Sequence, residues 1–258
     1  MMTSITDDQH TRILAFLDRL LYDAQVRDAF IEGGADDPRV ELDDDLRDAF
    51  SRVDLHELRL VGKRVRSEVL GGGIGTGAGI KAMFEQTLDL FHDVLGMSVH
   101  DIADEFIASP HFRSFRDVPF SPAGRGVMVP EAFYAFLVAR PDLCTDPDVE
   151  PCAHHEAATA ITAAVATGAS ATFDVALPGA SWHSGVLCIH RHYPAGGGST
   201  AQSSMYLAGN GRCVRGPATR ETFEQVVNCL DAIAADENPE PASDHRMFVR
   251  IRQWGLVS

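Results

Sequence analysis

Three histidines close together in the sequence are the residues best suited to chemistry. His183, His190 and His192 lie within ten residues, and the segment that holds the last two alternates apolar and polar residues as a strand does. His190 and His192 would then project from one face of that strand. Imidazole nitrogens bind zinc or non-haem iron, and His154-His155-Glu156 could add a further ligand. Because no metal-ligand spacing is complete, we favour a structural or interface role, with an iron or zinc site as the alternative.

A group of arginines near the end of the chain could recognise a ligand of opposite charge. Residues 248–254 read FVRIRQW, and this alternation predicts a final strand. The side chains of interest are Arg246, Phe248, Arg250 and Arg252. An exposed strand edge can bind an extended peptide, and a row of arginines would select an acidic one. The alternative is a solubilising edge strand, on which arginines discourage aggregation.

The glycine-rich segment at 71–79, GGGIGTGAG, resembles a phosphate-binding loop in composition only. It lacks the G-K-[ST] ending of a P-loop. Residues 77–82 match G-x-G-x-x-A, but the preceding segment is basic and helical in pattern, whereas a dinucleotide loop follows a buried strand. We therefore predict a flexible loop between helices. The alternative, a nucleotide-dependent enzyme, predicts thermal stabilisation by nucleotide, which we do not expect.

The predicted secondary structure that positions these residues changes from helices to strands near residue 168. Before it, apolar residues recur every three or four positions, as helices require. Thr6 and Gln9 fit a capping box at the start of one of these helices, and Ser98, with Asp101 at the third position after it, is expected to start another. The change indicates a helical module over 1–168 and a small α+β module over 169–258.

The second module is predicted to be a mostly antiparallel sheet with a helix. Residues 171–177 and 185–193 alternate as strands do, and Asn210-Gly211 is a strong signal for a hairpin. A helix follows over about 219–234. We therefore expect an α+β fold with an all-helical N-terminal part.

Composition narrows the classes of function. The chain has 258 residues and a formal net charge of −15, which argues against a nucleic-acid partner because phosphate binding needs a basic surface. No apolar run approaches the roughly 20 residues of a membrane span, and the N-terminus lacks the features of a signal peptide. The five cysteines form no C-x-x-C pair and fit free thiols in a reducing compartment. We expect a cytoplasmic location, with no membrane partner.

One segment carries a family resemblance. Ser109 to Leu137 reads S-P-x-F-R-x-F-R, a P-F loop and E-A-F-x-x-F-L, which resembles the helical part of partner proteins of multinuclear non-haem iron oxidative enzymes. Those enzymes modify ribosomally made peptides. Residues 206–227 are similar in style to the small β-rich module with which such partners present the precursor's leader peptide. Residues 10–60 also resemble small helical subunits of extradiol-type dioxygenases, which are accessory to a catalytic subunit.

The resemblance implies a protein that is itself not the catalyst. The iron ligands would belong to the partner enzyme, the helical module would dock that enzyme, and the C-terminal module would hold the precursor peptide. No cofactor is then expected in this chain. A mononuclear iron or zinc enzyme that uses His183, His190 and His192 is the alternative.

Overall fold

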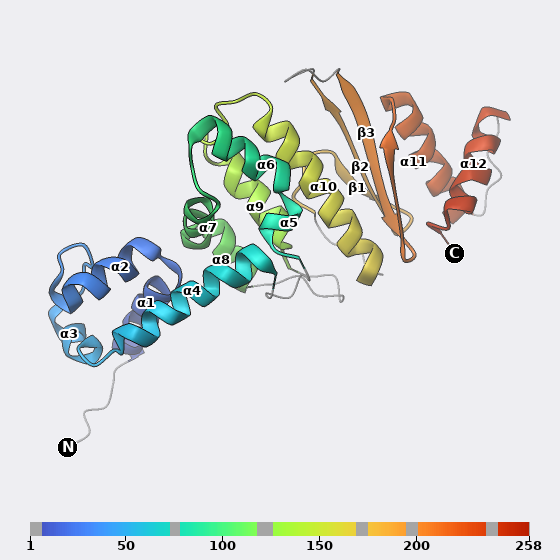
Figure 1. Ribbon diagram of the computed structural model, residues 1–258. Helices are drawn as coiled ribbons and strands as arrows, with labels where there is room; N and C mark the ends of the chain where they lie inside the picture. Colours follow the sequence, from blue (N-terminus) through green and yellow to red (C-terminus); the bar gives the residue numbers. More distant parts are fainter. Residues whose placement is uncertain are drawn as a thin grey trace. The chain divides into compact units, whose positions relative to one another are not determined.

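The computed structural model describes residues 7–72, 78–117, 126–168, 175–194, 201–235 and 242–257 (backbone only for residue 45 and residues 242–245). Helices fill the described chain up to residue 168, and a small sheet follows, which confirms the predicted α+β class (Figure 1). None of the described helices combines the length and the apolar character that crossing a bilayer requires.

The helices before residue 169 are mostly short. They are α1 (Asp7–Tyr22), α2 (Ala24–Gly33), the 3-10 helix η1 (Gly34–Asp36), α3 (Asp44–Phe50), α4 (Leu55–Gly71), α5 (Ile80–Met83), α6 (Glu85–Leu90), the π-helix η2 (Phe91–Leu95), α7 (Val99–Ala108), α8 (Pro110–Asp117), α9 (Val129–Val138) and α10 (Val149–Gly168). The later elements are β1 (Ala180–His183), β2 (Val186–Tyr193), β3 (Gln202–Gly209), β4 (Arg212–Pro217), α11 (Arg220–Ala234) and α12 (Ala242–Trp254).

The chain divides into two compact units. The first comprises Met1–Ala82 and Met97–Arg113, and the second comprises Met83–Gly96 and Ser114–Ser258. This division does not coincide with the predicted boundary at residue 168. The last helix before the sheet, α10, contacts β2, β3 and β4 as well as α6 and α9, and lies with all of them in the second unit.

The first unit is a small helical bundle with local capping. Asp23 and Asp54 accept hydrogen bonds from the first free backbone N–H groups of α2 and α4. Ser98, the predicted start of a helix, forms a capping box with Asp101 at the start of α7. The core gathers around Phe16, whose ring lies 4.6 Å from that of Phe50 in an edge-to-face arrangement. These apolar faces meet because their residues recur at helical spacing.

The sheet of the second unit is an antiparallel meander in the order β1-β2-β3-β4. Two tight turns set its register. Asn210 and Gly211, with φ of +46° and +74°, join β3 to β4 as predicted. Ser184 and Gly185, with φ of +54° and +78°, join β1 to β2 in the same manner, which the sequence reading missed. Both turns have the left-handed backbone that matches the twist of two-residue hairpins.

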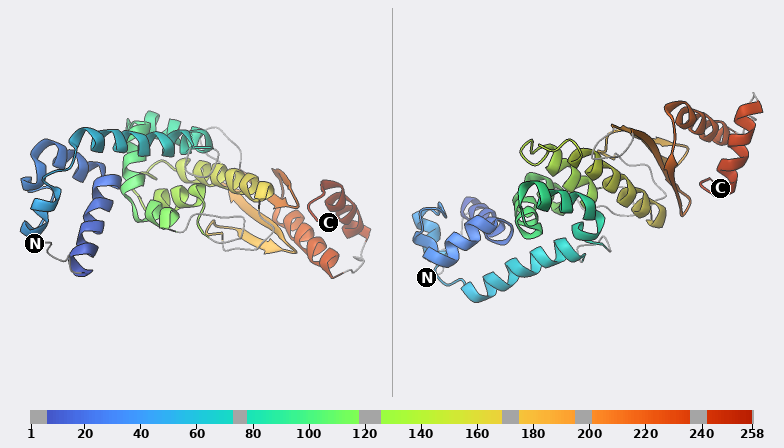
Figure 2. Two further views of the ribbon diagram at one scale, coloured as in Figure 1. Left: turned by 90° about the horizontal axis from the view of Figure 1, so that it is seen from below. Right: turned by 45° about the horizontal axis from the view of Figure 1, so that its top comes forward.

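Helices cover both faces of this sheet. α10 lies on one face, and α11 with α12 lies on the other (Figure 2). Leu187 and Ile189 of β2 face α10, whereas Val186 and Cys188 belong to the core shared with α11 and α12. Because successive strand residues point to opposite faces, both faces of β2 are apolar over residues 186–189, and this part of the strand is buried.

The C-terminal segment corrects a sequence prediction. Residues 248–254 lie in the helix α12 and not in a strand. Phe248 and Ile251 are buried one turn apart, whereas Val249, which a strand would place on the same face as Ile251, is 41% exposed. Residues are buried at a spacing of three or four positions, and this spacing determines that the segment is a helix. The arginines on either side of Ile251 imitate the alternation of a strand.

Two further predictions fall partly or wholly outside the described residues. The predicted strand at 171–177 lies there as far as residue 174, and residues 175–177 belong to no strand. Residues 73–77 of the glycine segment also lie there. The described ends of that segment lie close together, since a Cβ on Gly79 would sit 2.4 Å from the backbone nitrogen of Gly72.

Candidate functional site

The three predicted metal ligands lie near one another in sequence but have separate partners. Each histidine forms its own contact: His183 Nδ1 lies 3.2 Å from Asp231 Oδ2, His190 Nε2 lies 3.1 Å from the Ala218 carbonyl oxygen, and His192 Nδ1 lies 2.9 Å from Ser203 Oγ. The ring of His190 also stacks on Phe223. Within the described part of the chain, no three His, Cys, Asp or Glu side chains are grouped to hold a metal ion.

The predicted peptide-binding residues are placed by α12. Arg246, Arg250 and Arg252 are exposed, as a binding role requires. Phe248 is not: it packs into the core, and the guanidinium of Arg252 lies 4.6 Å from the centre of its ring. These four side chains therefore do not form the row along a strand edge that the sequence suggested.

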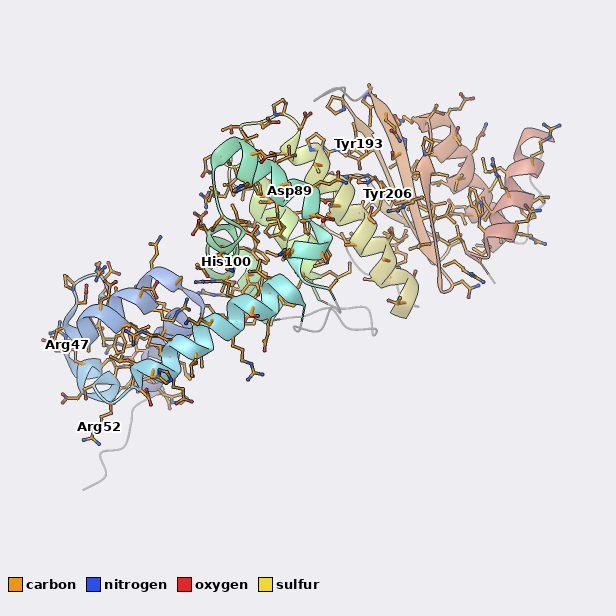
Figure 3. All side chains as sticks on the ribbon, in the orientation of Figure 1. Arg47, Arg52, Asp89, His100, Tyr193 and Tyr206 are labelled. Atoms are coloured by element: carbon orange, nitrogen blue, oxygen red, sulfur yellow. The ribbon has the colours of Figure 1, made fainter. Side chains whose placement is uncertain are left out.

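A polar cluster that the sequence reading largely missed lies between α10 and the sheet. His154 Nδ1 lies 2.9 Å from the hydroxyl of Tyr193, and the hydroxyls of Tyr193 and Tyr206 are 3.1 Å apart. His155 Nδ1 contacts the hydroxyl of Tyr206. Both tyrosines come from strands and point toward α10 (Figure 3). The four side chains thus form a continuous hydrogen-bonded chain.

The direction of every hydrogen bond in this chain follows from its buried end. His154 Nε2 lies 2.8 Å from the carbonyl oxygen of Pro178, which can only accept, so Nε2 carries the hydrogen. Nδ1 of the neutral ring then accepts from Tyr193. Tyr193 in turn accepts from Tyr206, and Tyr206 accepts from the Nδ1–H of His155. This chain therefore has one arrangement of its hydrogens when His154 is neutral.

The two histidines at the ends of this hydrogen-bonded chain differ in burial, which affects the pKa of each. His154 is fully buried, and desolvation lowers its pKa to about 4, so its ring is neutral at physiological pH. Burial raises the pKa of Tyr193 far above its usual value, which keeps its hydroxyl protonated. His155 is at the exposed end, where partial burial of its ring and the positive charge of Arg215 lower its pKa. This series of hydrogen bonds therefore connects the buried imidazole of His154 to the surface.

A second polar group lies on the same face of the sheet. Arg191 of β2 donates two hydrogen bonds to the carboxylate of Glu150, one of them 2.7 Å long, and Tyr134 of α9 donates to the same carboxylate. Burial alone would raise the pKa of Glu150, but the hydrogen bonds from Arg191 and Tyr134 outweigh it and lower the pKa. The ion pair between Arg191 and Glu150 therefore joins β2 to α10.

Chemically, the chain of four side chains can move a proton without moving its atoms far. A proton taken up by His155 leaves all the hydrogen bonds intact, since a protonated ring still donates from Nδ1. A proton passed on to Nδ1 of His154 would reverse the direction of its hydrogen bond with Tyr193, and of the other two bonds with it. The sequence did contain a signal for this cluster: two histidines on an alanine-rich helix, and Tyr193 on the same strand face as Leu187 and Ile189.

β4 is the last strand in the sheet, and its outer edge pairs with no described strand. Arg215 is paired directly across from Tyr206, which places it beside the His155 end of the chain. Arg215 and Cys213 are both exposed. Comparison with models of known protein families, with curated protein sequences and with solved structures finds no match to this chain.

Proposed function

We propose that this chain is a non-catalytic partner subunit that binds a ribosomally made precursor peptide in the cytoplasm and docks a metal-dependent oxidative enzyme. The observation that carries the peptide half is the exposed outer edge of β4. The enzyme half rests on the resemblance of residues 109–137 to partner proteins of such enzymes. In this proposal the peptide adds to the sheet as a further strand beside β4.

The backbone of β4 offers hydrogen-bonding groups to such a peptide. The two-residue turn makes Gly209 and Arg212 a hydrogen-bonded pair, so the pairs alternate from there along the hairpin. Cys213 and Arg215 fall at the non-bonded positions, and their N–H and C=O groups point away from β3. In the described part of the chain, neither residue bonds its backbone to another element. Two donors and two acceptors are therefore available at this edge.

The opposite edge of the sheet is less suited to the same role. β1 has four residues, and the outward N–H of Ala180 already donates to the carbonyl of Leu177 at 3.1 Å. His183 and Ser184, at the far end of β1, contact Asp231 of α11. An incoming strand therefore finds fewer accessible groups at β1, and we place the peptide at β4.

Arginines around β4 favour an acidic peptide. Arg215 projects from one face of the strand and Arg212 from the other, and both are exposed. The arginines of α12 form a second basic surface. The end of that helix meets the β3–β4 turn, where Asn210 Nδ2 donates to the carbonyl of Gly255 at 3.1 Å. These positive side chains stand out in a chain whose net charge is −15.

A pair of variants at Cys213 tests the main-chain contact. Cys213→Pro removes an outward N–H that β3 does not use, whereas Cys213→Ser keeps it. We expect the proline variant to bind the precursor peptide of this proposal at least about tenfold more weakly than the serine variant, by fluorescence anisotropy. Equal affinities, or no binding at about 50 μM peptide, would overturn the proposal.

A second set of variants tests whether the positive charge of Arg215 contributes to peptide binding. Arg215→Glu should weaken the same binding, and its matched control is Arg220→Glu, an exposed arginine at the start of α11 that pairs with Glu224. A similar loss in both variants would mean that only net charge matters. For the enzyme half, we expect the oxidative enzyme that this proposal requires to co-purify with the full chain, and failure of the two proteins to associate would contradict this half alone.

A further inference from the structure

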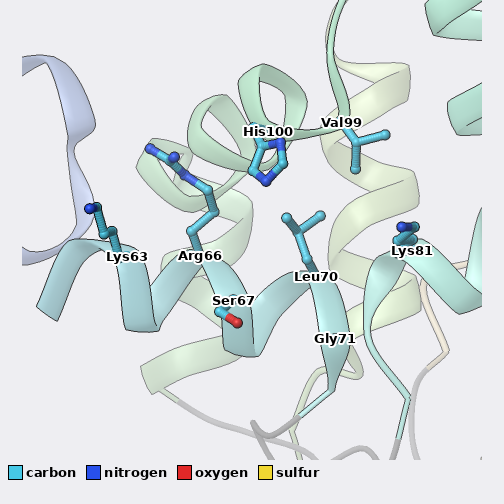
Figure 4. Close-up of a pocket in the computed structure, with 8 residues that line it drawn as sticks. All are labelled: Lys63, Arg66, Ser67, Leu70, Gly71, Lys81, Val99 and His100. Atoms are coloured by element: carbon cyan, nitrogen blue, oxygen red, sulfur yellow. The ribbon is translucent and has the colours of Figure 1, made fainter. Parts of the chain in front are cut away.

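A pocket in the first unit is lined almost entirely by basic and small side chains. Its volume is about 400 Å³, and its walls come from α4, α5 and the first turn of α7 (Figure 4). The lining residues are Lys63, Arg66, Ser67, Leu70, Gly71, Lys81, Val99 and His100. None of the eight is acidic, although acidic residues far outnumber basic ones in the chain.

Both lysines of the protein line this pocket. The sequence contains 22 lysines and arginines together, and Lys63 and Lys81 are the only lysines among them. They come from different helices, 18 positions apart, and stand at opposite ends of the lining with His100 and Leu70 between them (Figure 4). Elsewhere the chain uses arginine, which favours planar, two-pronged contacts with carboxylates.

Among the described residues, no ion pair cancels the charge of the two lysines. Arg66 is committed to Asp104, with which it forms a two-pronged ion pair across to α7. Asp101, the nearest acid on the first turn of α7, accepts hydrogen bonds from Ser98 as part of the capping box. Lys63 and Lys81 form no ion pair with any described residue. The pocket therefore has an excess of positive charge.

A close approach of the backbone brings Lys81 to this place. Gly79 packs directly against the end of α4, where any side chain would collide with the carbonyl of Leu70. Gly72, with φ of +86°, meets the same point from the other side. The two glycines thus hold the start of α5 against the end of α4, and Lys81 follows two residues later.

We propose that this pocket binds a small organic phosphate that carries more than one negative charge. Lysine ammonium groups are compact point charges with freely rotating donors, which suit tetrahedral phosphate oxygens. The hydroxyl of Ser67 adds a donor, and Leu70 and Val99 offer an apolar wall for the organic part. A volume of about 400 Å³ exceeds that of a phosphate ion and lies in the range of small-molecule sites.

The ligand spans the pocket, because its charge must reach a lysine at each end. This site belongs to the first unit alone and does not depend on the peptide proposal, so either can fail without the other. It also differs from a dinucleotide loop, since the element before the glycine segment is the helix α4 and not a strand.

The presence of only two lysines makes the test direct. Reductive methylation with ¹³C-formaldehyde keeps the positive charge and gives each lysine its own NMR signal in the full-length protein. Inorganic tripolyphosphate is the probe, because it is elongated and multiply charged. We expect both lysine signals to move together along one saturable curve, with half-saturation below about 1 mM.

Matched variants make the result specific. Lys63→Gln and Lys81→Gln should each weaken tripolyphosphate binding about tenfold or more, as measured by calorimetry. Arg64→Gln, on the same helix but outside the pocket and paired with Glu68, should leave it within about twofold. Shifts that do not saturate by about 10 mM, or an equal loss in the Arg64 variant, would overturn the proposal.

Discussion

Lowering the pH should destabilise the second compact unit through a buried side chain, His154. In the folded chain its Nδ1 accepts from Tyr193 and its Nε2 donates to the carbonyl of Pro178, an arrangement that requires the neutral ring. Burial lowers the pKa of His154 from 6.5 to about 4. In the unfolded chain the same imidazole is in water and takes up a proton near its ordinary pKa.

The sign and size of the effect follow from these two pKa values. Between them the unfolded state binds more protons than the folded state, so stability falls as the pH falls. The stability associated with neutral His154 is fully present well above pH 6.5, is lost progressively down to about pH 4, and stays constant below that. From about pH 7.5 to about pH 5, the loss amounts to about 2 kcal/mol.

Urea unfolding followed by tryptophan fluorescence measures this loss. Both tryptophans, Trp182 and Trp254, lie in the second unit and report on its unfolding. The matched variant is His154→Gln, whose amide can donate to Pro178 and accept from Tyr193 but does not titrate. We expect the wild-type chain to lose about 2 kcal/mol more than this variant over the same pH change. An equal pH dependence in the two proteins would refute the reasoning.

Four other substitutions, one of them a matched control, test the structure of the second unit. Arg191→Met should destabilise the second unit by about 2 kcal/mol because it strands the half-buried carboxylate of Glu150, whereas Arg140→Met at an exposed pair should cost under about 0.5 kcal/mol in the same urea assay; equal costs would contradict this difference. Glu156→Ala should cost about 2 kcal/mol, since Glu156 of α10 accepts hydrogen bonds from the first N–H groups of α6. Amide exchange at the start of α6 should then quicken, and unchanged exchange would count against this capping role. Gly211→Ala should cost about 1 kcal/mol, because φ there is +74°; an unaltered thermal midpoint would be inconsistent with the left-handed turn.

Local signals in the sequence predicted much of the fold. The Asn210-Gly211 turn and the helix start at Ser98 depend on neighbouring residues alone, and both are confirmed. The helix α12 was predicted wrongly because two periods compete in one short segment. Alternating arginines suggested a strand, whereas burial of Phe248 and Ile251 against the sheet selects a helix.

The candidate sites depend on long-range packing that spacing does not reveal. The hydrogen bond between His155 and Tyr206 joins residues 51 positions apart, and it exists because α10 lies across the sheet in one register. Likewise, Lys63 and Lys81 share a pocket only because Gly79 lets two helix ends approach closely. The histidines of the β2 segment were visible in the sequence, but their separate partners were not.

Hydrogen exchange at single amides of β4 is the most direct test of the peptide-binding edge. The N–H groups of Cys213 and Arg215 point outward, whereas that of Val214 is bonded to β3. When the precursor peptide is added, the account predicts that exchange at Cys213 and Arg215 slows by about tenfold or more, while exchange at Val214 changes little. Binding of the peptide without protection of those two amides would contradict the account.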